Sequence, residues 1–184
     1  MTMLNGTRQL GPRDGRLLLK TSRTGLGRKA GHDLTIEVSR WVADLVVDQG
    51  DPARSGVAVT IEADSLRVLE GTGGLKPLSD ADRAEIEKTI REKILHPADH
   101  PVIRFSSQQV TGNAASFGIT GDLSIMDRTH PVQVQAAMAG GRIQGNATIT
   151  QSAWGIRPYS AFAGALRLAD DVRVEFDLAA QAGG

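Results

Sequence analysis

Two histidines of the chain stand at a spacing that could hold a metal ion. His96 and His100 are four positions apart, so on a helix both imidazoles would face the same side, as zinc ligands can. Pro97 and Pro101 follow them directly, and a proline disfavours helical backbone at the residue before it. A zinc site would also need a third ligand. We therefore expect neither a metal nor any other cofactor.

His32 and Asp33 form a second group with chemical potential, because a carboxylate beside an imidazole can orient it for acid–base catalysis. The same pair could equally cap a strand and satisfy backbone groups, and we favour that structural interpretation. His130 falls at the corner of a predicted hairpin, where exposure is expected. The chain has no cysteine, which excludes thiol catalysis and disulfides, and no Gly-x-Ser-x-Gly motif for a serine nucleophile.

The glycine-rich residues 71–76, Gly-Thr-Gly-Gly-Leu-Lys, faintly resemble a phosphate-binding loop. They lack the Gly-x-x-x-x-Gly-Lys-Ser/Thr spacing and the strand–loop–helix setting of such a loop, so we interpret them as an ordinary loop. None of these groups predicts an enzyme. A catalytic alternative, in which His32, Asp33 and Tyr159 act on an apolar substrate, is kept open.

The elements that must position these residues belong to a chain of 184 residues and 19.5 kDa, the size of one domain. We expect a loose lead-in over residues 1–12 and a single domain over 13–180. The 21 Lys and Arg are scattered among 21 Asp and Glu, without the clustered basic excess that nucleic-acid binding needs. No stretch approaches the ~18 apolar residues of a membrane span, and residues 1–15 contain no signal-peptide run, so a cytoplasmic location is expected.

Apolar and polar residues alternate over most of the chain, which is the pattern of half-buried antiparallel strands. Glycine-containing turns separate nearly all of these runs, and no strand–helix–strand rhythm is present. Several short strands in succession predict an all-β barrel or sandwich, between which periodicity alone does not decide. The clearest runs begin at Leu34, Trp41, Val57, Ile103 and Val172.

One substantial helix is predicted over about residues 79–95. Ser79 is a good N-cap, and Asp82 three residues later completes a variant of the capping box. An apolar stripe at helical spacing is formed by Ile86, Ile90 and Ile94.

Several segments, taken in order, carry a resemblance to a known family. They are residues 31–34 (Gly-His-Asp-Leu), 61–66 (Ile-Glu-Ala-Asp-Ser-Leu), 100–105 (His-Pro-Val-Ile-Arg-Phe), 121–134 (Gly-Asp-Leu-Ser-Ile-Met-Asp-Arg-Thr-His-Pro-Val-Gln-Val), 152–156 (Ser-Ala-Trp-Gly-Ile) and 171–172 (Asp-Val). Together they resemble the YceI-like family. The resemblance implies a closed, lipocalin-like antiparallel barrel of about eight strands. The full helix predicted here departs from the short helical stretch that is usual in the family.

The resemblance also implies a ligand. Members of the family hold a long isoprenoid or other lipid inside the barrel, so binding, sequestration or transport of an isoprenoid, an isoprenoid quinone or a fatty-acid-like lipid is expected. Residues 71–78 depart from the family pattern, and Trp154 replaces its Phe, so the ligand need not be a polyprenyl chain. The expected lining residues are Leu34, Ile36, Trp41, Leu45, Phe105, Phe117, Trp154 and Phe162, with Arg157 or Tyr159 meeting a polar head at the mouth.

Residues 154–166 gather three aromatic residues and do not alternate cleanly, which predicts a long loop between the last two strands. This loop could cap one barrel end, gate a mouth or form a partner surface. If the core were filled, the chain would instead be an interaction module, and the loop and the helix would be partner or homodimer surfaces. Small inward-facing candidates are consistent with either space or close packing, namely Ala43, Ala136, Gly145 and Ala147.

Overall fold

A computed structural model of the chain describes residues 5–161 and 166–180. Its main feature is an 11-stranded sheet in which every neighbouring pair is antiparallel. In spatial order the strands are β1 (Gly6–Leu10), β5 (Trp41–Val47), β6 (Gly56–Glu62), β8 (Val102–Asn113), β9 (Ser116–Ile125), β10 (Arg128–Ala139), β11 (Arg142–Thr150), β14 (Asp171–Ala179), β2 (Gly15–Lys20), β4 (Asp33–Val38) and β7 (Leu66–Thr72).

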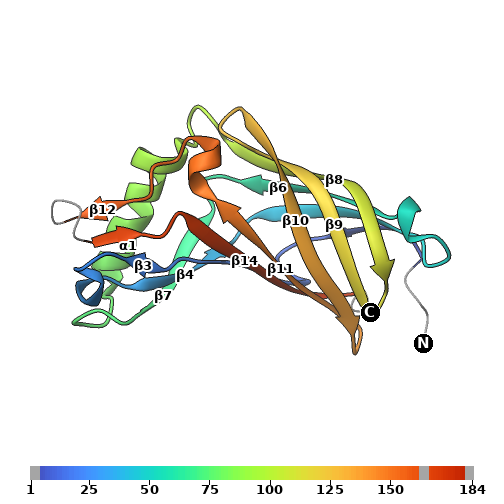
Figure 1. The fold of residues 1–184 in the computed structure, drawn as a ribbon, viewed down its shortest axis with the longest axis horizontal. Helices are drawn as coiled ribbons and strands as arrows, with labels where there is room; N and C mark the ends of the chain where they lie inside the picture. Colours follow the sequence, from blue (N-terminus) through green and yellow to red (C-terminus); the bar gives the residue numbers. More distant parts are fainter. Residues whose placement is uncertain (1–4, 162–165, 181–184) are drawn as a thin grey trace.

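The sheet curls into a half-barrel (Figure 1), so the all-β prediction is confirmed. The closed barrel of about eight strands is a correction, because the hydrogen-bonded order ends at β1 and β7 and contains 11 strands. Alternation identifies single strands, whereas closure depends on which strands pair at the two ends. Part of the expected lead-in, residues 1–12, also proves to be strand β1, which pairs with β5. Only Leu10 of β1 is buried, so its pattern gave little signal.

One long hairpin turns a corner between the two ends of the sheet. Only Ser39 and Arg40 separate β4 from β5, and residues 63–65 separate β6 from β7. β5 pairs with β6, but β4 pairs with β7, so the hairpin changes direction at these residues. At the corner the backbone N–H of Ser39 donates to the carbonyl oxygen of Ser65 at 2.9 Å. The bend thereby joins the β5–β6 part of the sheet to the β4–β7 part.

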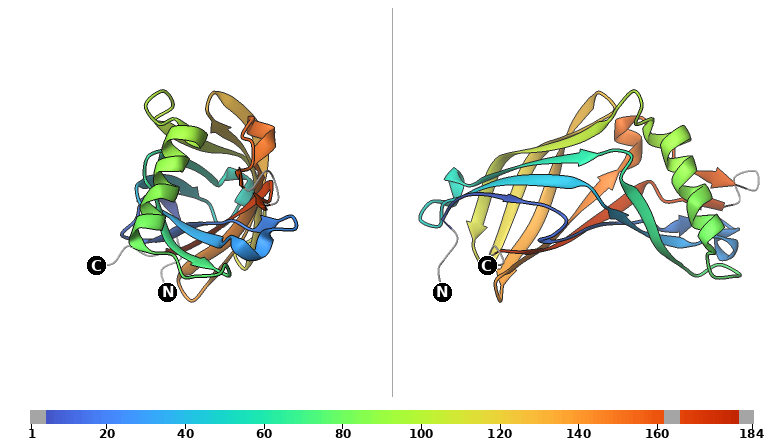
Figure 2. Two further views of the ribbon diagram at one scale, coloured as in Figure 1. Left: turned by 90° about the vertical axis from the view of Figure 1, so that its left-hand side faces the viewer. Right: turned by 180° about the vertical axis from the view of Figure 1, so that it is seen from behind.

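The predicted helix is confirmed. Helix α1 (Asp80–Thr89) starts at the N-cap Ser79, whose side chain forms the expected capping box with Asp82. A π-helical segment, η3 (Ile90–Leu95), continues it and ends at His96, which has a left-handed φ of 47°. Figure 2 shows that α1 crosses one end of the half-barrel, called the α1 end below.

A small second sheet lies at the same α1 end (Figure 1). It contains β12 (Ser160–Ala161), β13 (Leu166–Leu168) and β3 (Arg23–Thr24), in that order. The predicted long loop over residues 154–166 is therefore partly regular structure, since a 3₁₀ turn, Gln151–Trp154, precedes it and β12 lies within it. Short paired strands of two or three residues are too brief to show alternation in the sequence.

Candidate ligand-binding cavity

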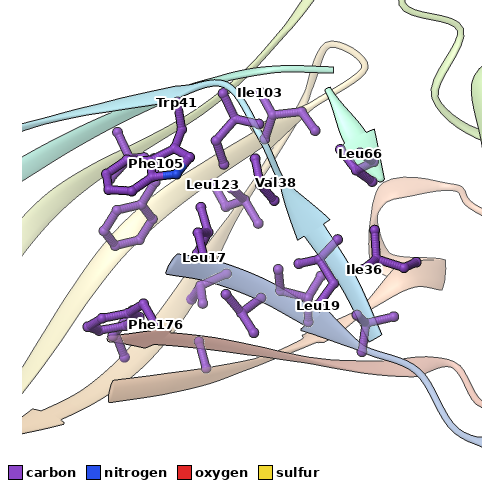
Figure 3. A pocket seen from close by; sticks show the side chains of 18 of the residues that line it. Leu17, Leu19, Ile36, Val38, Trp41, Leu66, Ile103, Phe105, Leu123 and Phe176 are labelled. Atoms are coloured by element: carbon purple, nitrogen blue, oxygen red, sulfur yellow. The ribbon is translucent and has the colours of Figure 1, made fainter. Parts of the chain in front are cut away.

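The inner face of the half-barrel surrounds a cavity of about 1060 Å³ with a mainly apolar wall. Side chains from β2, β4, β5, β6, β8, β9, β10, β11 and β14 contribute to the wall, together with α1 and η3. Figure 3 shows Leu17, Val38, Trp41, Phe105 and Phe176 approaching the same space from different strands. The sheet thus gathers apolar residues that lie far apart in the sequence.

Strand alternation explains how each strand contributes to the wall. On β5, Trp41 and Ala43 are buried and line the cavity, whereas Val42 and Asp44 are exposed on the outer face. Leu45 continues the inner row. Successive side chains of a strand point to opposite faces, so one face of each strand builds the wall and the other faces solvent.

Two glycines let aromatic rings lie close to the wall. A Cβ at Gly121 would lie 2.5 Å from Cζ of Phe105, and one at Gly145 would lie 2.4 Å from Cζ of Phe176. Both separations are well below van der Waals contact, so the rings occupy the places where side chains of these strands would otherwise stand. Gly145 therefore makes room for a ring rather than for a ligand.

Helical residues cover the cavity at the α1 end. Ile86, Ile90 and Ile94 all line it, which is the isoleucine stripe predicted from the sequence. The backbone N–H of Val68 on the end strand β7 donates to the Glu87 carboxylate at 2.9 Å. This bond ties α1 to a strand whose outer edge has no neighbouring strand in the described sheet.

Polar groups in the wall gather mainly near the two ends of the cavity. At the α1 end they include Arg23, which forms an ion pair with Asp33 at 2.9 Å. Nε2 of His32 lies 2.6 Å from the carbonyl oxygen of Lys76, to which it can donate. Asp82 also lines this end, and hydrogen bonds from the backbone and hydroxyl of Ser79 hold its pKa below the ordinary value. An apolar ligand with a polar terminus would find charged and polar groups here.

Most of the expected lining residues lie in the wall. The structure brings together Leu34, Ile36, Trp41, Leu45, Phe105, Phe117 and Tyr159 around the cavity. Their predicted role in binding a ligand stays a prediction.

Two of the expected residues, Trp154 and Arg157, are placed otherwise. Trp154 is 3% exposed but is not part of the wall. Its Nε1 donates to the carbonyl oxygen of Leu123 at 3.0 Å, and its ring meets His130 edge-on, with ring centroids 5.2 Å apart. Arg157 is exposed and also outside the wall. Phe162 lies outside the described residues.

The residues considered for catalysis or metal binding have other contacts. His32 contacts Lys76, and Asp33 pairs with Arg23, so each of these two side chains has a structural partner. His100 lies 3.2 Å from Asp127. Within residues 5–161 and 166–180, no group of three His, Asp or Glu side chains is arranged to hold a metal ion.

The sequence-based selection missed much of the wall. Several of the missed residues stand in runs that alternation predicted as strands, or in the predicted helix. Choosing every inward-facing apolar residue of these elements would have included them. They include Leu17, Leu19, Val59, Ile86, Ile103, Val174 and Phe176.

No helix in the described part of the chain is both long and apolar enough to span a bilayer.

The family model of the YceI-like domain matches residues 19–180 of the sequence. No curated protein matches the chain.

Solved structures show the same fold. BcnA of Burkholderia cenocepacia is 17% identical, with a TM-score of 0.59, 88% of this chain covered and 94% of that chain covered. A Campylobacter jejuni YCEI protein is 11% identical, with a TM-score of 0.59 and coverage of 81% and 85%. A mutant of the C. jejuni protein, described with a monobromobimane guest, is 12% identical, with a TM-score of 0.61 and coverage of 81% and 85%. Because the domain model spans most of its length, the chain belongs to the YceI-like family.

Proposed function

We propose that the chain binds and carries a long hydrophobic molecule, such as an isoprenoid, an isoprenoid quinone or a fatty-acid-like lipid, in the cavity of the half-barrel. The observation that carries this proposal is the continuous apolar cavity of about 1060 Å³. Typical pockets for drug-sized ligands occupy roughly 300–1,000 Å³, so a lipid-sized guest fits this space. Membership of a family of lipid-binding barrels supports the same conclusion.

Desolvation supplies the affinity in this mechanism. Each buried CH₂ group contributes about 0.8 kcal/mol, so about ten methylenes give roughly 8 kcal/mol before the costs of binding. Loss of translational and conformational freedom subtracts several kcal/mol. The remainder is enough for retention of a long chain, and a short chain would be held weakly.

The polar head of such a ligand is placed at the α1 end in our proposal. Arg23, His32 and Tyr159 line the cavity there, and Tyr159 is 45% exposed, as expected for a residue at a mouth. Its ring can contact an apolar chain while its hydroxyl meets water or a head group. Arg157, the other residue considered for this role, is exposed but lies outside the wall.

Native mass spectrometry of freshly purified protein, followed by denaturing extraction, tests the proposal. Wild-type protein should carry a discrete lipid-sized adduct. Ala147 lines the cavity from β11, so Ala147→Phe should fill the space and remove the adduct. Its neighbour Thr148 is exposed on the outer face, which makes Thr148→Phe the matched control that should keep the adduct. Loss of the adduct in both variants, or in neither while both stay folded, would contradict the cavity as the binding site.

A further inference from the structure

Trp41 carries an unpartnered polar atom in the apolar cavity. Among buried side-chain nitrogen and oxygen atoms of the described residues, its indole Nε1 alone has no hydrogen-bond partner. The residue is 5% exposed and lines the cavity. Unpaired buried donors are rare in folded proteins, because burial removes their hydrogen bond to water and nothing replaces it. Each such donor therefore needs a physical explanation.

The surroundings of Trp41 do not favour water as the partner. Figure 3 shows the indole among the side chains of Val38, Ile103, Phe105 and Leu123, all of them apolar. A buried water needs about two to four polar partners to be held in place. The indole N–H would be one partner, and these neighbouring side chains supply no other.

Trp154 shows how the fold treats an indole that belongs only to the core. It is buried like Trp41, yet its Nε1 donates to the carbonyl oxygen of Leu123 at 3.0 Å. The difference between the two tryptophans is that Trp41 faces the cavity and Trp154 does not. The unpartnered donor therefore belongs to a residue that a ligand in the cavity would contact.

Trp41 also stands part way along the cavity. The segment formed by β4 and β5 runs from Asp33 near the α1 end to Val47 near the opposite end, and Trp41 lies close to its middle. A group bonded to this indole would therefore belong to the interior of an extended ligand, separate from a head group at the α1 end.

We infer that the ligand carries a hydrogen-bond acceptor, a carbonyl, ester, ether or hydroxyl oxygen, part way along its apolar length, and that Trp41 Nε1 donates to it. This inference rests on the proposed function and narrows it to oxygen-bearing lipids over plain hydrocarbons. The apolar wall supplies most of the affinity, whereas the single donor selects among chains of similar length.

Two probes of equal length test the inference, a long-chain ketone with its carbonyl at mid-chain and the corresponding alkane. Binding is followed by displacement of a fluorescent fatty acid and by the two indole N–H signals in the NMR spectrum of isotope-labelled protein. The ketone should shift the Trp41 signal downfield and leave the Trp154 signal in place. Trp41→Phe should weaken ketone binding by about threefold to tenfold more than it weakens alkane binding, because only the ketone loses a hydrogen bond.

The outcomes separate the inference from the proposed function. If both probes bind, but the Trp41 signal and the Trp41→Phe variant do not distinguish them, the inference is wrong and the cavity remains a lipid site. If the fluorescent fatty acid does not bind and neither probe binds by NMR, the proposed function fails and the inference fails with it. Trp154→Phe is the control variant, because its indole does not line the cavity.

A separate observation concerns the outer surface at the α1 end. Leu26 is 101% exposed and Leu75 is 82% exposed, on two different loops. Arg23 joins these loops, because its Nη1 donates to the carbonyl oxygen of Arg28 at 2.7 Å while its guanidinium lies against Gly73. The views in Figures 1 and 2 agree that both loops lie side by side at this end.

Cations accompany the two leucines. Arg28, Lys29 and Lys76 are exposed, and none of them forms an ion pair with another described residue. Several acidic groups nearby are already engaged, since Asp33 pairs with Arg23 and Asp80 with Arg83. The surface thus combines projecting apolar side chains with cations that form no ion pair within the described part of the chain.

We propose that the surface formed by Leu26, Leu75, Arg28, Lys29 and Lys76 docks on an anionic lipid bilayer. Leucines at such a surface enter the headgroup region, and cations beside them contact anionic lipids. Leu75 and Lys76 also belong to the cavity wall, so docking would place the mouth of the cavity against the bilayer. This proposal does not depend on a bound ligand.

Co-sedimentation with vesicles tests the docking surface. Wild-type protein should bind vesicles containing phosphatidylglycerol more tightly than vesicles of phosphatidylcholine alone, and added salt should weaken the binding. The double substitution Leu26→Glu and Leu75→Glu should reduce binding by about tenfold or more. Val42→Glu is the matched control, because Val42 is exposed on the outer face of β5 and should tolerate the charge.

Other results would overturn the docking proposal. Equal binding to both kinds of vesicle, or an equal loss in the Val42→Glu control, would show that these loops do not recognise an anionic bilayer. Concentration-dependent dimerisation that the double substitution abolishes, without vesicle binding by the wild type, would instead assign the surface to a second copy of the chain.

Discussion

The hydroxyl of Ser65 donates a 3.2 Å hydrogen bond to the carbonyl oxygen of Arg40 across the corner of the bent hairpin. Ser65 is 0% exposed, and its own carbonyl oxygen accepts from the backbone and the hydroxyl of Ser39. The chain changes strand partners at this point, so some backbone groups are not in a regular ladder. Backbone N–H groups and the hydroxyls of the two serines satisfy the carbonyl groups of Arg40 and Ser65 and hold the bend that shapes the cavity.

Ser65→Ala should destabilise the protein by about 1–2 kcal/mol, because the Arg40 carbonyl loses the fully buried Ser65 hydroxyl and keeps only the backbone N–H of Glu62 as a donor. Ser39→Ala should cost less, because Ser39 is only half-buried and water can take the place of its hydroxyl, whereas Ser65 is 0% exposed. Urea denaturation gives both free energies of unfolding. A larger loss in Ser39→Ala than in Ser65→Ala would show that the corner does not depend on the Ser65 hydroxyl.

Substitution by phenylalanine should change the free energy of unfolding by different amounts at Trp41 and Trp154. Trp154→Phe breaks a buried hydrogen bond to Leu123 and should lower the free energy of unfolding by about 1–3 kcal/mol. Trp41→Phe removes a donor that has no partner in the described structure, so the ligand-free protein should lose less than about 1 kcal/mol. Thermal and urea unfolding of delipidated protein measure the difference. Equal losses would mean that the Trp41 indole is bonded in the ligand-free state.

Gly121→Ala should be poorly tolerated. The new Cβ would lie 2.5 Å from both Cζ of Phe105 and the carbonyl oxygen of Ser106, and the backbone atom cannot move aside without disturbing the sheet. We expect a loss of about 1–3 kcal/mol in the free energy of unfolding. Gly118→Ala on the same strand is the control, because its nearest neighbours would be side-chain atoms at 3.4 Å or more. Similar stability of the two variants would contradict the close approach at Gly121.

Local patterns predicted the local structure well. The Ser79–Asp82 capping box and the isoleucine spacing lie within one helix, so no distant residue was needed to predict α1. Strand alternation likewise separated inward from outward residues on β5. What alternation does not contain is the pairing between strands far apart in the sequence, such as β2 with β14, on which the open, 11-stranded arrangement depends.

In the candidate site, too, local features were predictable from the sequence, whereas contacts between distant residues were not. Leu34, Trp41 and Phe105 lie in the cavity wall because they stand on inward faces of long strands, which alternation can indicate. Trp154 is equally apolar and buried, but it comes from a 3₁₀ turn, and only the tertiary contacts with Leu123 and His130 show that it packs outside the wall. Burial can be predicted from residue type, whereas the neighbours against which a turn residue packs cannot.

Acid pH should weaken the start of α1 through Asp82. Hydrogen bonds from the backbone and hydroxyl of Ser79 hold the pKa of this carboxyl below its ordinary value in the folded chain, and unfolding removes both bonds. A pKa that is lower in the folded state gives a stabilisation that is complete above the unfolded pKa and is lost as the pH falls through the folded pKa. The difference in free energy of unfolding between wild type and Asp82→Asn should therefore be largest near neutral pH and shrink below about pH 4. Denaturant unfolding at a series of pH values measures it, and a difference that stayed constant into strong acid would show that the Asp82 charge does not stabilise the helix.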